Sequence, residues 1–470
     1  MHFRLSNFCD TVWLFSRSAI ILTTALIVSL TMPSENNAQE DEKNIFLQVI
    51  LSTLQSNPQI QEARSRLIAA QEKYNQNLAI FLPHVNMVSA INNDRIGREH
   101  GASSNTQKSL GVEISQTIVD IPAILSFSQT KPYIAAFEED LQATSQIIIL
   151  ETVRAMINVR QAEEIAKLAE QNLATANRNL KMTEAGYQAG DMTKTDINHA
   201  QAQVANATAE LARTFNDIDI TRSQYKEWVG SDILPNLTIP EVPTTYRPPP
   251  LQDLLSRVDN RPDLRAANYR LEVSDSLVNI EKSGHMPSLN LSFTGNRYAD
   301  TNLSGQELLY EKSIMLKASL PIFSGGSTSS RTREAIAARS TQKTEVARLR
   351  LQAIREIEQS YMTFESTRST LIALQESVRV SRETLKGVSA EFRSGSRSAF
   401  DLMNTQNQLF QAETELTKGR YMVVKALFQL LFSEGELKME NLDKNSSPNR
   451  HAAPQNTQLN PNSAPSTPSE

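Results

Sequence analysis

Residues 391–416 read EFRSGSRSAFDLMNTQNQLFQAETEL, and residues 186–211 read GYQAGDMTKTDINHAQAQVANATAEL. At one constant offset the two stretches share a series of related residues, namely Tyr187 with Phe392, Gly190 with Gly395, Asp196 with Asp401, Gln201 with Gln406 and Glu210 with Glu415. A self-match at a fixed separation indicates an internal repeat. The period is far too long for a solenoid, so it predicts a chain built from two similar halves.

Each copy of this stretch predicts the tip of a helical hairpin. A glycine, Gly190 or Gly395, suits the left-handed backbone position just after the end of a helix. The next helix then begins with a hydroxyl residue and, three positions later, a carboxylate, which are Thr193 with Asp196 and Ser398 with Asp401. In that spacing the hydroxyl caps a free backbone N–H, and the carboxylate reaches back to the cap residue.

The composition favours long helices over sheets. The chain of 470 residues contains only 15 glycines and 6% aromatic residues, whereas 40% of its residues are hydrophobic. The net charge of −5 is not concentrated in a block, so nothing predicts a nucleic-acid surface. The histidines lack metal-ligand spacing, and the sequence has neither a phosphate loop nor a Gly-x-Ser-x-Gly motif. We therefore expect no cofactor and no enzymatic activity.

The N-terminus predicts a secretory signal peptide over residues 1–38. Arginines supply positive charge, and residues 19–30 form an apolar core that is too short to span a bilayer comfortably. Cleavage near Ala38 is the expectation, and an uncleaved anchor is the alternative. The cysteine of the chain, Cys9, precedes the apolar core, so the mature protein would have neither a disulfide nor a cysteine for lipid attachment.

Four segments show the alternation of apolar and polar residues that is typical of strands. In the first of them, Val85, Met87 and Ile91 fall on one face, with polar residues on the other. The predicted strands cover about residues 84–92, 109–118, 288–296 and 313–322, with polar loops at 93–108 and 296–312. Their length of about ten residues suits tilted strands of an outer-membrane barrel. A soluble sandwich is the alternative, and four strands are too few to close a barrel alone.

The segments between the strands and the tips predict very long helices. Glycine and proline are absent from residues 133–185 and 327–386, and at about 1.5 Å per residue such helices are roughly 80–90 Å long. Apolar residues recur at a spacing of seven in the same register in both halves, starting from Val159 and from Phe364. This spacing indicates coiled-coil-like packing. A spectrin-like rod would explain the spacing but not the strands.

The chain divides into two repeats. Prolines concentrate in the segment between them, and the residues after 441 are rich in Asn, Pro, Ser and Gln, a composition that cannot bury a core. The predicted domains are the signal peptide at 1–38, the first repeat at 44–229 with its tip at 186–198, a proline-rich linker at 230–260, the second repeat at 261–435 with its tip at 391–404, and a disordered tail at 441–470.

Together, the signal peptide, paired strands, long helices, proline-rich centre and duplicated tip resemble the TolC family of outer-membrane channel proteins. The resemblance covers roughly residues 44–435. Its most specific parts are the tip at 391–416 and the segment LPIFSGG at 320–326, which is similar to the family's strand-to-helix junction. The first repeat departs from this pattern, because residues 117–122 read TIVDIP and lack the double glycine.

The resemblance implies a mainly α fold with a β-barrel part. The duplicated helix–strand–helix repeat would form, as a homotrimer, a shared 12-stranded outer-membrane β-barrel that continues as a long periplasmic α-helical coiled-coil barrel. Three copies would remove every free strand edge. The protein would lie in the outer membrane of a Gram-negative bacterium and extend into the periplasm, with the loops at 93–108 and 296–312 outside the cell.

The resemblance also implies a passive exit duct in a tripartite export system. Its partners would be a periplasmic adaptor of the membrane fusion type and an inner-membrane transporter of the RND, ABC or MFS class, with outer-membrane lipid around the barrel. Drug efflux and type I protein secretion are both compatible with such a channel. The alternative from another class is a non-pore structural periplasmic coiled-coil protein.

In the family the tips form a gate at the inner end of the tunnel. Asp401 matches the first of two acidic ring positions, whereas the second position holds Asn404, so the constriction would carry three carboxylates rather than six. Such a ring should attract cations. On spacing alone, Asp196 and Asp401 are interpreted as helix caps, and capping does not exclude pore lining.

The resemblance assigns a latch to the same tips. Arg397 matches a basic latch residue, and Thr195 and Asp196 match its partners. Phe392 stands where the family pattern has a tyrosine, so a hydroxyl bond to Asp196 would be missing. We expect Arg397 and Asp196 to form the closing link, in a gate that is held less tightly than the family pattern implies.

Overall fold

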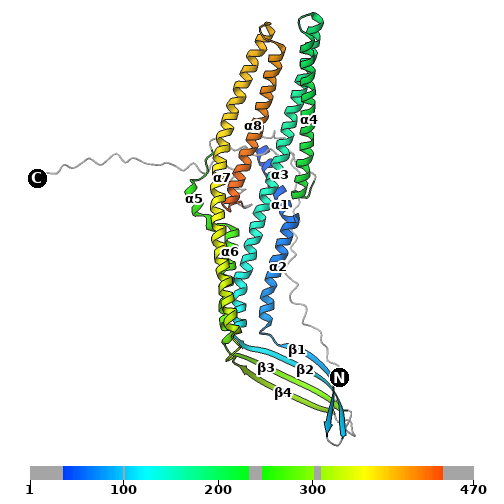
Figure 1. Cartoon of the computed structure of the whole chain (residues 1–470), viewed down its shortest axis with the longest axis vertical. Coiled ribbons are helices and arrows are strands. Elements are labelled where there is room, and N and C mark those ends of the chain that lie inside the picture. Colours follow the sequence, from blue (N-terminus) through cyan, green and yellow to red (C-terminus); the bar gives the residue numbers. More distant parts are fainter. Residues whose placement is uncertain (1–34, 99–100, 232–245, 301–307, 438–470) are drawn as a thin grey trace, which may run out of the picture.

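The computed structural model describes residues 35–98, 101–231, 246–300 and 308–437. Most of the predicted signal peptide and all of the predicted tail lie outside these ranges. The molecule is elongated, with long helices along its length and a four-stranded sheet at one end (Figure 1). The fold is therefore mainly α with a separate β part, as the sequence predicts.

The two repeats contain the same succession of elements. Each begins with a helix that leads into a β-hairpin, and continues through a very long helix, a tight turn and another long helix. The first repeat consists of α2 (Pro58–Ala79), β1 (His84–Arg98), β2 (Gly101–Asp120), α3 (Ile121–Ala189) and α4 (Lys194–Val229). The second consists of α6 (Pro262–Lys282), β3 (Ser288–Asp300), β4 (Leu308–Ser319), α7 (Ser327–Arg393) and α8 (Ala399–Ser433). Helix α1 (Glu35–Ser56) comes before α2 and overlaps the start of the predicted first repeat at 44–229.

The proline-rich linker contains secondary structure in its second half. Helix α5 (Leu251–Ser256) and the 3-10 helix η1 (Val258–Asn260) lie within the predicted linker 230–260, and a further 3-10 helix, η2 (Ser283–His285), follows α6. Leu254 and Val258 are buried in a cluster with residues of α6, α7 and α8. These apolar side chains, placed between the prolines, therefore anchor the linker to the long helices.

The long helices are buried unevenly along their length. Helices α3 and α7 contain 69 and 67 residues, so each is about 100 Å long. At mid-length the seven-residue seam is fully buried, because Val159 and Phe364 are both 0% exposed. Towards the tip the side chains of the seam become more exposed, and Tyr187 at the end of the first seam is 47% exposed. The seam therefore holds the centre of the molecule more firmly than its tips.

A contact between the first and last helices closes each repeat. In the first repeat, the side-chain amide of Asn57, just before α2, donates to the carbonyl oxygen of Trp228 near the end of α4 at 3.1 Å. In the second, Arg261 holds the equivalent place before α6 and donates to the carbonyl oxygen of Ser433 at the end of α8, also at 3.1 Å. The start and the end of each repeat therefore meet near the middle of the molecule.

The sheet is antiparallel with the order β1-β2-β3-β4, so β1 and β4 form its two edges. Val85, Ile114, Phe293 and Ile314 pair in one row across all four strands and share one face. We call this face the apolar face, and the opposite one, which carries residues such as Glu113 and Thr294, the polar face. Val88 and Met315 are exceptions, because they lie on the polar face.

The strands differ from the predicted ones in their bounds. Strands β1 and β2 stay paired as far as Arg98 and Gly101, so most of residues 93–108 belong to the hairpin rather than to a loop. Strand β3 runs to Asp300, and β4 covers Leu308–Ser319 rather than 313–322. The prediction relied on apolar alternation, which stops where the side chains become polar. Backbone pairing continues there because the ladder joins main-chain groups.

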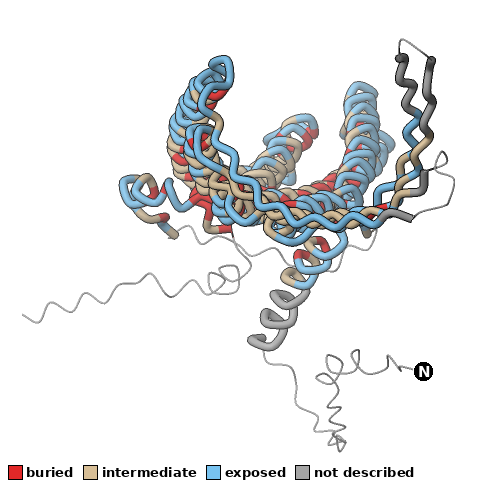
Figure 2. Tube along the Cα trace, turned by 90° about the horizontal axis from the view of Figure 1, so that it is seen from below, coloured by how far each residue is buried: buried red, intermediate tan, exposed pale blue. Residues whose placement is uncertain are grey.

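Seen along the long axis, the helices follow an open arc rather than a closed bundle (Figure 2). Two clusters of buried apolar residues hold the arc together. One joins α3 to α1 and to the ends of α4 and α8, and the other joins α5, α7 and α8. One side of the arc stays uncovered, so the described chain forms a curved wall and does not enclose a space by itself.

Candidate functional site

Both hairpin tips have the same backbone geometry. Gly190 after α3 and Gly395 after α7 have φ values of +85° and +76°, in the left-handed region that glycine adopts without strain. Their N–H groups donate to the carbonyl oxygens of Tyr187 and Phe392, at 3.1 and 3.0 Å. The repeated sequence therefore folds into the same turn twice, at the end of the molecule that lies farthest from the sheet (Figure 1).

A reciprocal pair of hydrogen bonds begins each of the following helices. The N–H of Thr193 donates to Asp196 Oδ2 at 2.8 Å, and the N–H of Asp196 donates to Thr193 Oγ1 at 3.2 Å. Ser398 and Asp401 make the same bonds at 3.3 and 3.1 Å. The Thr193 N–H is the main cause that lowers the pKa of Asp196, and the Ser398 hydroxyl is the main cause that lowers the pKa of Asp401. The capping boxes predicted from the spacing are confirmed.

The two tips of one chain pack against each other through an apolar cluster. Its buried members are Ala200 of α4 and Ala399 and Met403 of α8. The ring of Phe392 packs against this cluster, so it contributes to a contact within the chain. Further from the tip, the Asn179 amide donates to Gln406 Oε1 at 2.5 Å and joins α3 to α8.

Arg397 bonds within its own turn. Its Nε donates to Glu391 Oε2 at 2.9 Å, and this bond is the main cause that raises the pKa of Arg397. No ion pair joins Arg397 to Asp196 within the described part of this chain. Thr195 and Asn404 have exposed side chains. A latch across the gate and an acidic ring at Asp401 both require neighbouring copies, so both stay predictions.

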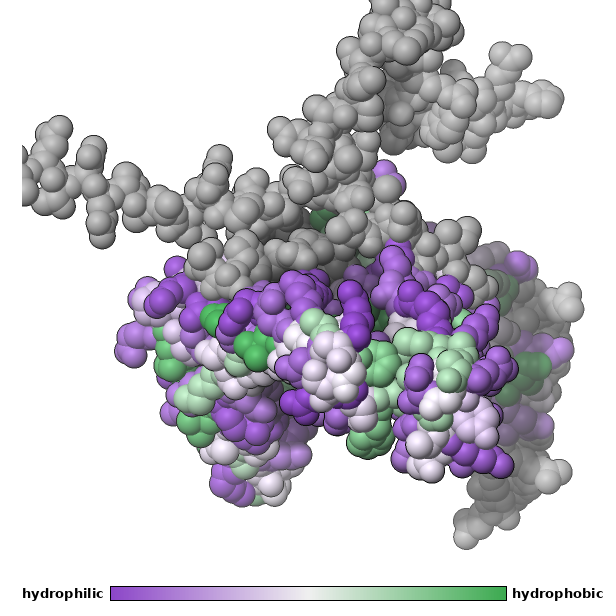
Figure 3. All heavy atoms as spheres, turned by 90° about the horizontal axis from the view of Figure 1, so that it is seen from above, coloured by the Kyte–Doolittle hydropathy of each residue, from purple (hydrophilic) through white to green (hydrophobic). Residues whose placement is uncertain are grey.

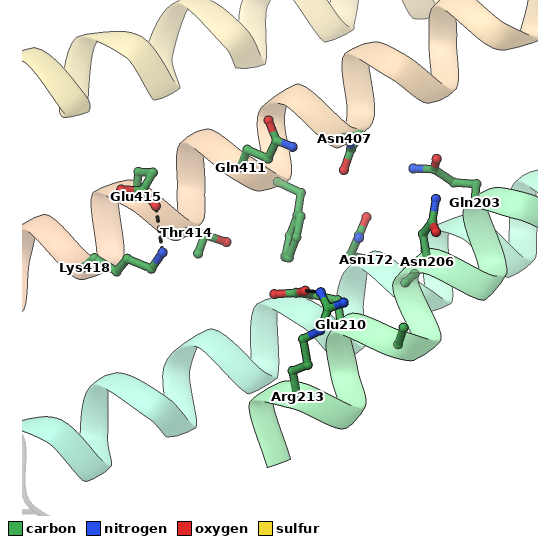
Figure 4. A pocket seen from close by; sticks show the side chains of 13 residues that line it. Asn172, Gln203, Asn206, Glu210, Arg213, Asn407, Gln411, Thr414, Glu415 and Lys418 are labelled. Carbon is green, nitrogen blue, oxygen red and sulfur yellow. Dashed lines mark hydrogen bonds and ion pairs between the residues drawn. The ribbon is translucent and has the colours of Figure 1, made fainter. Parts of the chain in front are cut away.

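A polar groove separates α4 from α8 below the tips (Figure 4). Its volume is about 380 Å³. Amide side chains point toward this space from three helices, and they are Asn172 of α3, Gln203 and Asn206 of α4, and Asn407 and Gln411 of α8. Charged residues lie at its other end, where Glu210 pairs with Arg213 at 3.0 Å and Glu415 pairs with Lys418 at 2.7 Å.

This groove was not predicted from the sequence. The signal was present, because the asparagines and glutamines recur in both copies of the duplicated stretch, between the tip and Glu210 or Glu415. Viewed from the tip end, hydrophilic residues cover most of the described surface, with hydrophobic side chains gathered in patches between them (Figure 3). Such a polar groove can bind another polar helix or peptide through amide hydrogen bonds.

Two other kinds of site are absent from the described residues. No group of three or more His, Cys, Asp or Glu side chains in the described residues is placed to hold a metal ion. None of the helices within residues 35–98, 101–231, 246–300 and 308–437 combines the length and the apolarity that a membrane crossing requires. In the described part of the chain, the tips and the groove between the helices are therefore the candidate functional sites.

Comparison with known proteins relates this architecture to one family. The sequence model of the outer membrane efflux protein family matches residues 49–230 and 255–436, which together make up more than half of the chain. The outer membrane efflux protein BepC of Brucella suis is 25% identical over 74% of this chain and 76% of its own length. The outer membrane protein TolC of Escherichia coli is 23% identical over 84% and 83% of the two chains. The solved structure of VceC from Vibrio cholerae has a TM-score of 0.72 at 18% identity and covers 86% and 99%.

Proposed function

Because the chain belongs to the outer membrane efflux protein family, we propose that it is the passive exit duct of a tripartite export system. The protein lies in the outer membrane and extends into the periplasm, and its family is one of channel proteins. In the proposed role it conducts drugs or secreted proteins outward from an inner-membrane transporter of the RND, ABC or MFS class. The duct itself carries out no reaction, so the energy for transport comes from that transporter.

The observation that carries this proposal is the open geometry of the single chain. The helices form one curved wall, and the sheet has two free edges, β1 and β4. Exposed edges are a template for pairing with another chain, and four strands are too few to close a barrel. A homotrimer would pair β4 of each copy with β1 of the next, and the three walls would then surround one continuous tunnel.

The distances along the molecule fit a duct that reaches inward from the membrane. With the sheet in the membrane, α3 and α7 carry the tips about 100 Å away from it. We place a periplasmic adaptor against the helices near the tips, where the polar groove between α4 and α8 offers amide groups for hydrogen bonds. An adaptor that bound there would join the duct to the transporter.

The tips serve as the gate in this proposal. Asp401 of each copy lines the constriction together with Asn404, and Arg397 links to Asp196 and Thr195 when the gate is closed. The guanidinium of Arg397 would then have two alternative partners, which are Asp196 in the closed gate and Glu391 in its own turn. The bond of Arg397 to Glu391 supports this proposal. Phe392 holds the two tips of a chain together, so we expect them to move as one unit.

Reconstitution of the purified protein tests the proposed function. A trimeric mass by native mass spectrometry and stepwise conductance in planar lipid bilayers are expected. The groove is tested with the double variant Asn407→Ala and Gln411→Ala. In cells this variant should no longer support export, whereas its single-channel conductance in bilayers should be retained. A soluble monomer without conductance would instead identify a non-pore structural coiled-coil protein of the periplasm.

A further inference from the structure

The apolar face of the sheet carries three positive charges near the loop end of the strands. Lys108 of β2, Arg297 of β3 and Lys312 of β4 lie on this face, because each is an even number of residues from a member of the central apolar row. Pairing across the strands agrees, since Arg297 is opposite both Leu110 and Tyr310. All three cationic side chains are exposed.

The three cations are neighbours. Lys108 pairs with Ala299, two positions from Arg297, and Arg297 pairs with Tyr310, two positions from Lys312. Diagonal neighbours of this kind are about 7–8 Å apart in an antiparallel sheet. The strands run obliquely to the long axis, and β4 lies farther from the helices than β1 (Figure 1). From β2 to β4, each strand lies farther from the helices than the one before it. Along the ladder, each cation lies two residues nearer the helical end than the cation on the preceding strand. These two displacements oppose each other, so the three cations lie at a similar distance from the helices.

The charges on the two faces of the sheet are segregated. The carboxylates of Glu113 and Glu311 lie on the polar face, where Tyr298 donates to Glu311 at 2.9 Å. On the apolar face, the strand positions whose side chains the structure describes hold no carboxylate. Among these described positions, the cations therefore have no anionic neighbour on their own face. A charge on a lipid-facing surface is tolerated near the membrane interface far better than at its centre.

An aromatic ring positions the central cation. The Arg297 guanidinium lies over the ring of Tyr310, 5.8 Å from its centroid, within the range of a cation–π contact. Tyr310 is 68% exposed, so this ring is presented to the surroundings of the sheet. Aromatic residues form girdles at the interfaces of outer-membrane barrels. A guanidinium stacked on a ring can still donate from its edge to a ligand that lies at the same level.

We propose that Lys108, Arg297 and Lys312 bind the phosphate groups of a phosphorylated lipid in the outer leaflet. The helices extend into the periplasm, so the loop end of the sheet faces the outer leaflet. Arginine binds phosphate through two parallel hydrogen bonds, and lysine binds it as a point charge. The apolar rows below the cations, such as Phe293 with Ile314, would contact the acyl chains of the same lipid. The site rests on the closed barrel proposed above, with its apolar face toward the lipid.

The test compares lipid binding by the full protein and a triple variant. Lys108→Gln, Arg297→Gln and Lys312→Gln remove the charges and keep polar side chains. A matched control removes three exposed charges at the other end of the molecule through Arg379→Gln, Lys386→Gln and Arg393→Gln. Each trimer is incubated with bisphosphorylated lipid A or with the fully dephosphorylated lipid of the same acyl chains, and bound lipid is measured by native mass spectrometry.

The parent and the control should bind bisphosphorylated lipid A equally, and the triple variant should bind it roughly ten-fold more weakly or worse, since each basic residue near a charged lipid surface contributes several-fold. Equal binding by the triple variant would overturn the proposal, as would equal binding of the dephosphorylated lipid. Displacement of the lipid by an equal concentration of inorganic phosphate would point to a free-anion site and also overturn it.

Conductance of the triple variant should equal that of the parent, and this separates failure of the lipid site from failure of the duct. If the triple variant does not form trimers, Arg297→Gln alone is measured and should show an intermediate loss.

Discussion

Glu434 should make the stability of the protein depend on pH. It follows the last residue of α8, is buried, and has a pKa raised from 4.5 to about 7. Burial is the main cause and the nearby Glu436 adds to it, while Arg257 offsets part of the shift. The cation beside this position is Arg261, which donates to the carbonyl oxygen of Ser433. It is already paired with Asp263 at 2.7 Å and with Glu356 at 3.0 Å, so its charge is balanced by those carboxylates rather than by Glu434. The negative end of the α8 dipole also disfavours the ionised carboxylate.

The sign of the effect follows from the raised value. The folded protein binds this proton more tightly than the unfolded chain, so the contribution of Glu434 is fully present below about pH 4.5 and is lost as the pH rises through about 7. A shift of this size corresponds to about 3 kcal/mol per chain. Between pH 5 and pH 8 the loss amounts to about 2.5 kcal/mol. Replacement of Glu434 by a neutral side chain of the same shape should remove this pH dependence.

We therefore expect Glu434→Gln to exceed the stability of the parent by less than about 1 kcal/mol at pH 5 and by about 3 kcal/mol at pH 8. Urea unfolding followed by the fluorescence of Trp228 measures this, because Trp228 packs against the same apolar cluster as the end of α8. The exposed pair of Glu415 and Lys418 supplies the control, and Glu415→Gln should change stability by less than about 1 kcal/mol at either pH. The same pH profile in Glu434→Gln and the parent would refute the reasoning.

Three further predictions concern the tips and the closing contact of the second repeat. Arg397→Ser should raise single-channel conductance, by about five-fold at most, because an exposed ion pair contributes no more than about 1 kcal/mol. Asp401→Ala should weaken block by trivalent cations, whereas Ser398→Ala, which removes the hydroxyl of the same helix cap, should leave block unchanged. Gly435→Ala and Gly230→Ala both place a side chain at a left-handed φ, of +74° and +76°, at a cost of about 1–2 kcal/mol each. Gly435→Ala should unfold at the lower urea concentration, since its Cβ would lie 3.1 Å from the backbone of the chain segment before α6.

Each of these three predictions has a control variant or a result that would contradict it. Arg393→Ser removes a neighbouring charge whose side chain bonds only weakly, to Ser389 at 3.4 Å, and should not change conductance. An unchanged conductance in Arg397→Ser would exclude a latch at that residue. Equal loss of block in Asp401→Ala and Ser398→Ala would assign the effect to helix capping rather than to a ring of charge. Equal urea midpoints for the two glycine variants would mean that the tight contact at Gly435 relaxes without cost.

Local sequence rules predicted most of the tips. Gly190 and Gly395 adopt the left-handed turn, and both capping boxes form, because these features depend on residues within four positions of one another. The bond between Arg397 and Glu391 is also local, yet the resemblance directed attention to a partner in the other tip. Contacts between copies cannot be read from either the sequence pattern or one chain, which is why the gate remains a proposal.

The groove and the ends of the strands were harder to predict. The groove exists because α3, α4 and α8 meet, and its lining residues Asn172 and Asn407 are separated by half of the sequence. Periodicity locates the apolar side of a helix but does not say which polar sides will face one another. The outer parts of β1 and β2 lack apolar alternation, and their pairing is set by the turn and the main-chain ladder.

The bonds from Asn57 to Trp228 and from Arg261 to Ser433 have an evolutionary consequence. Since the first and last helices of each repeat touch, an ancestral gene for a single repeat would encode a unit whose termini were already adjacent. Tandem duplication of that gene then required only a short joint between one copy's end and the next copy's start. The same adjacency means that a circularly permuted chain, beginning at residue 261 and ending at residue 230, should retain every contact within each repeat.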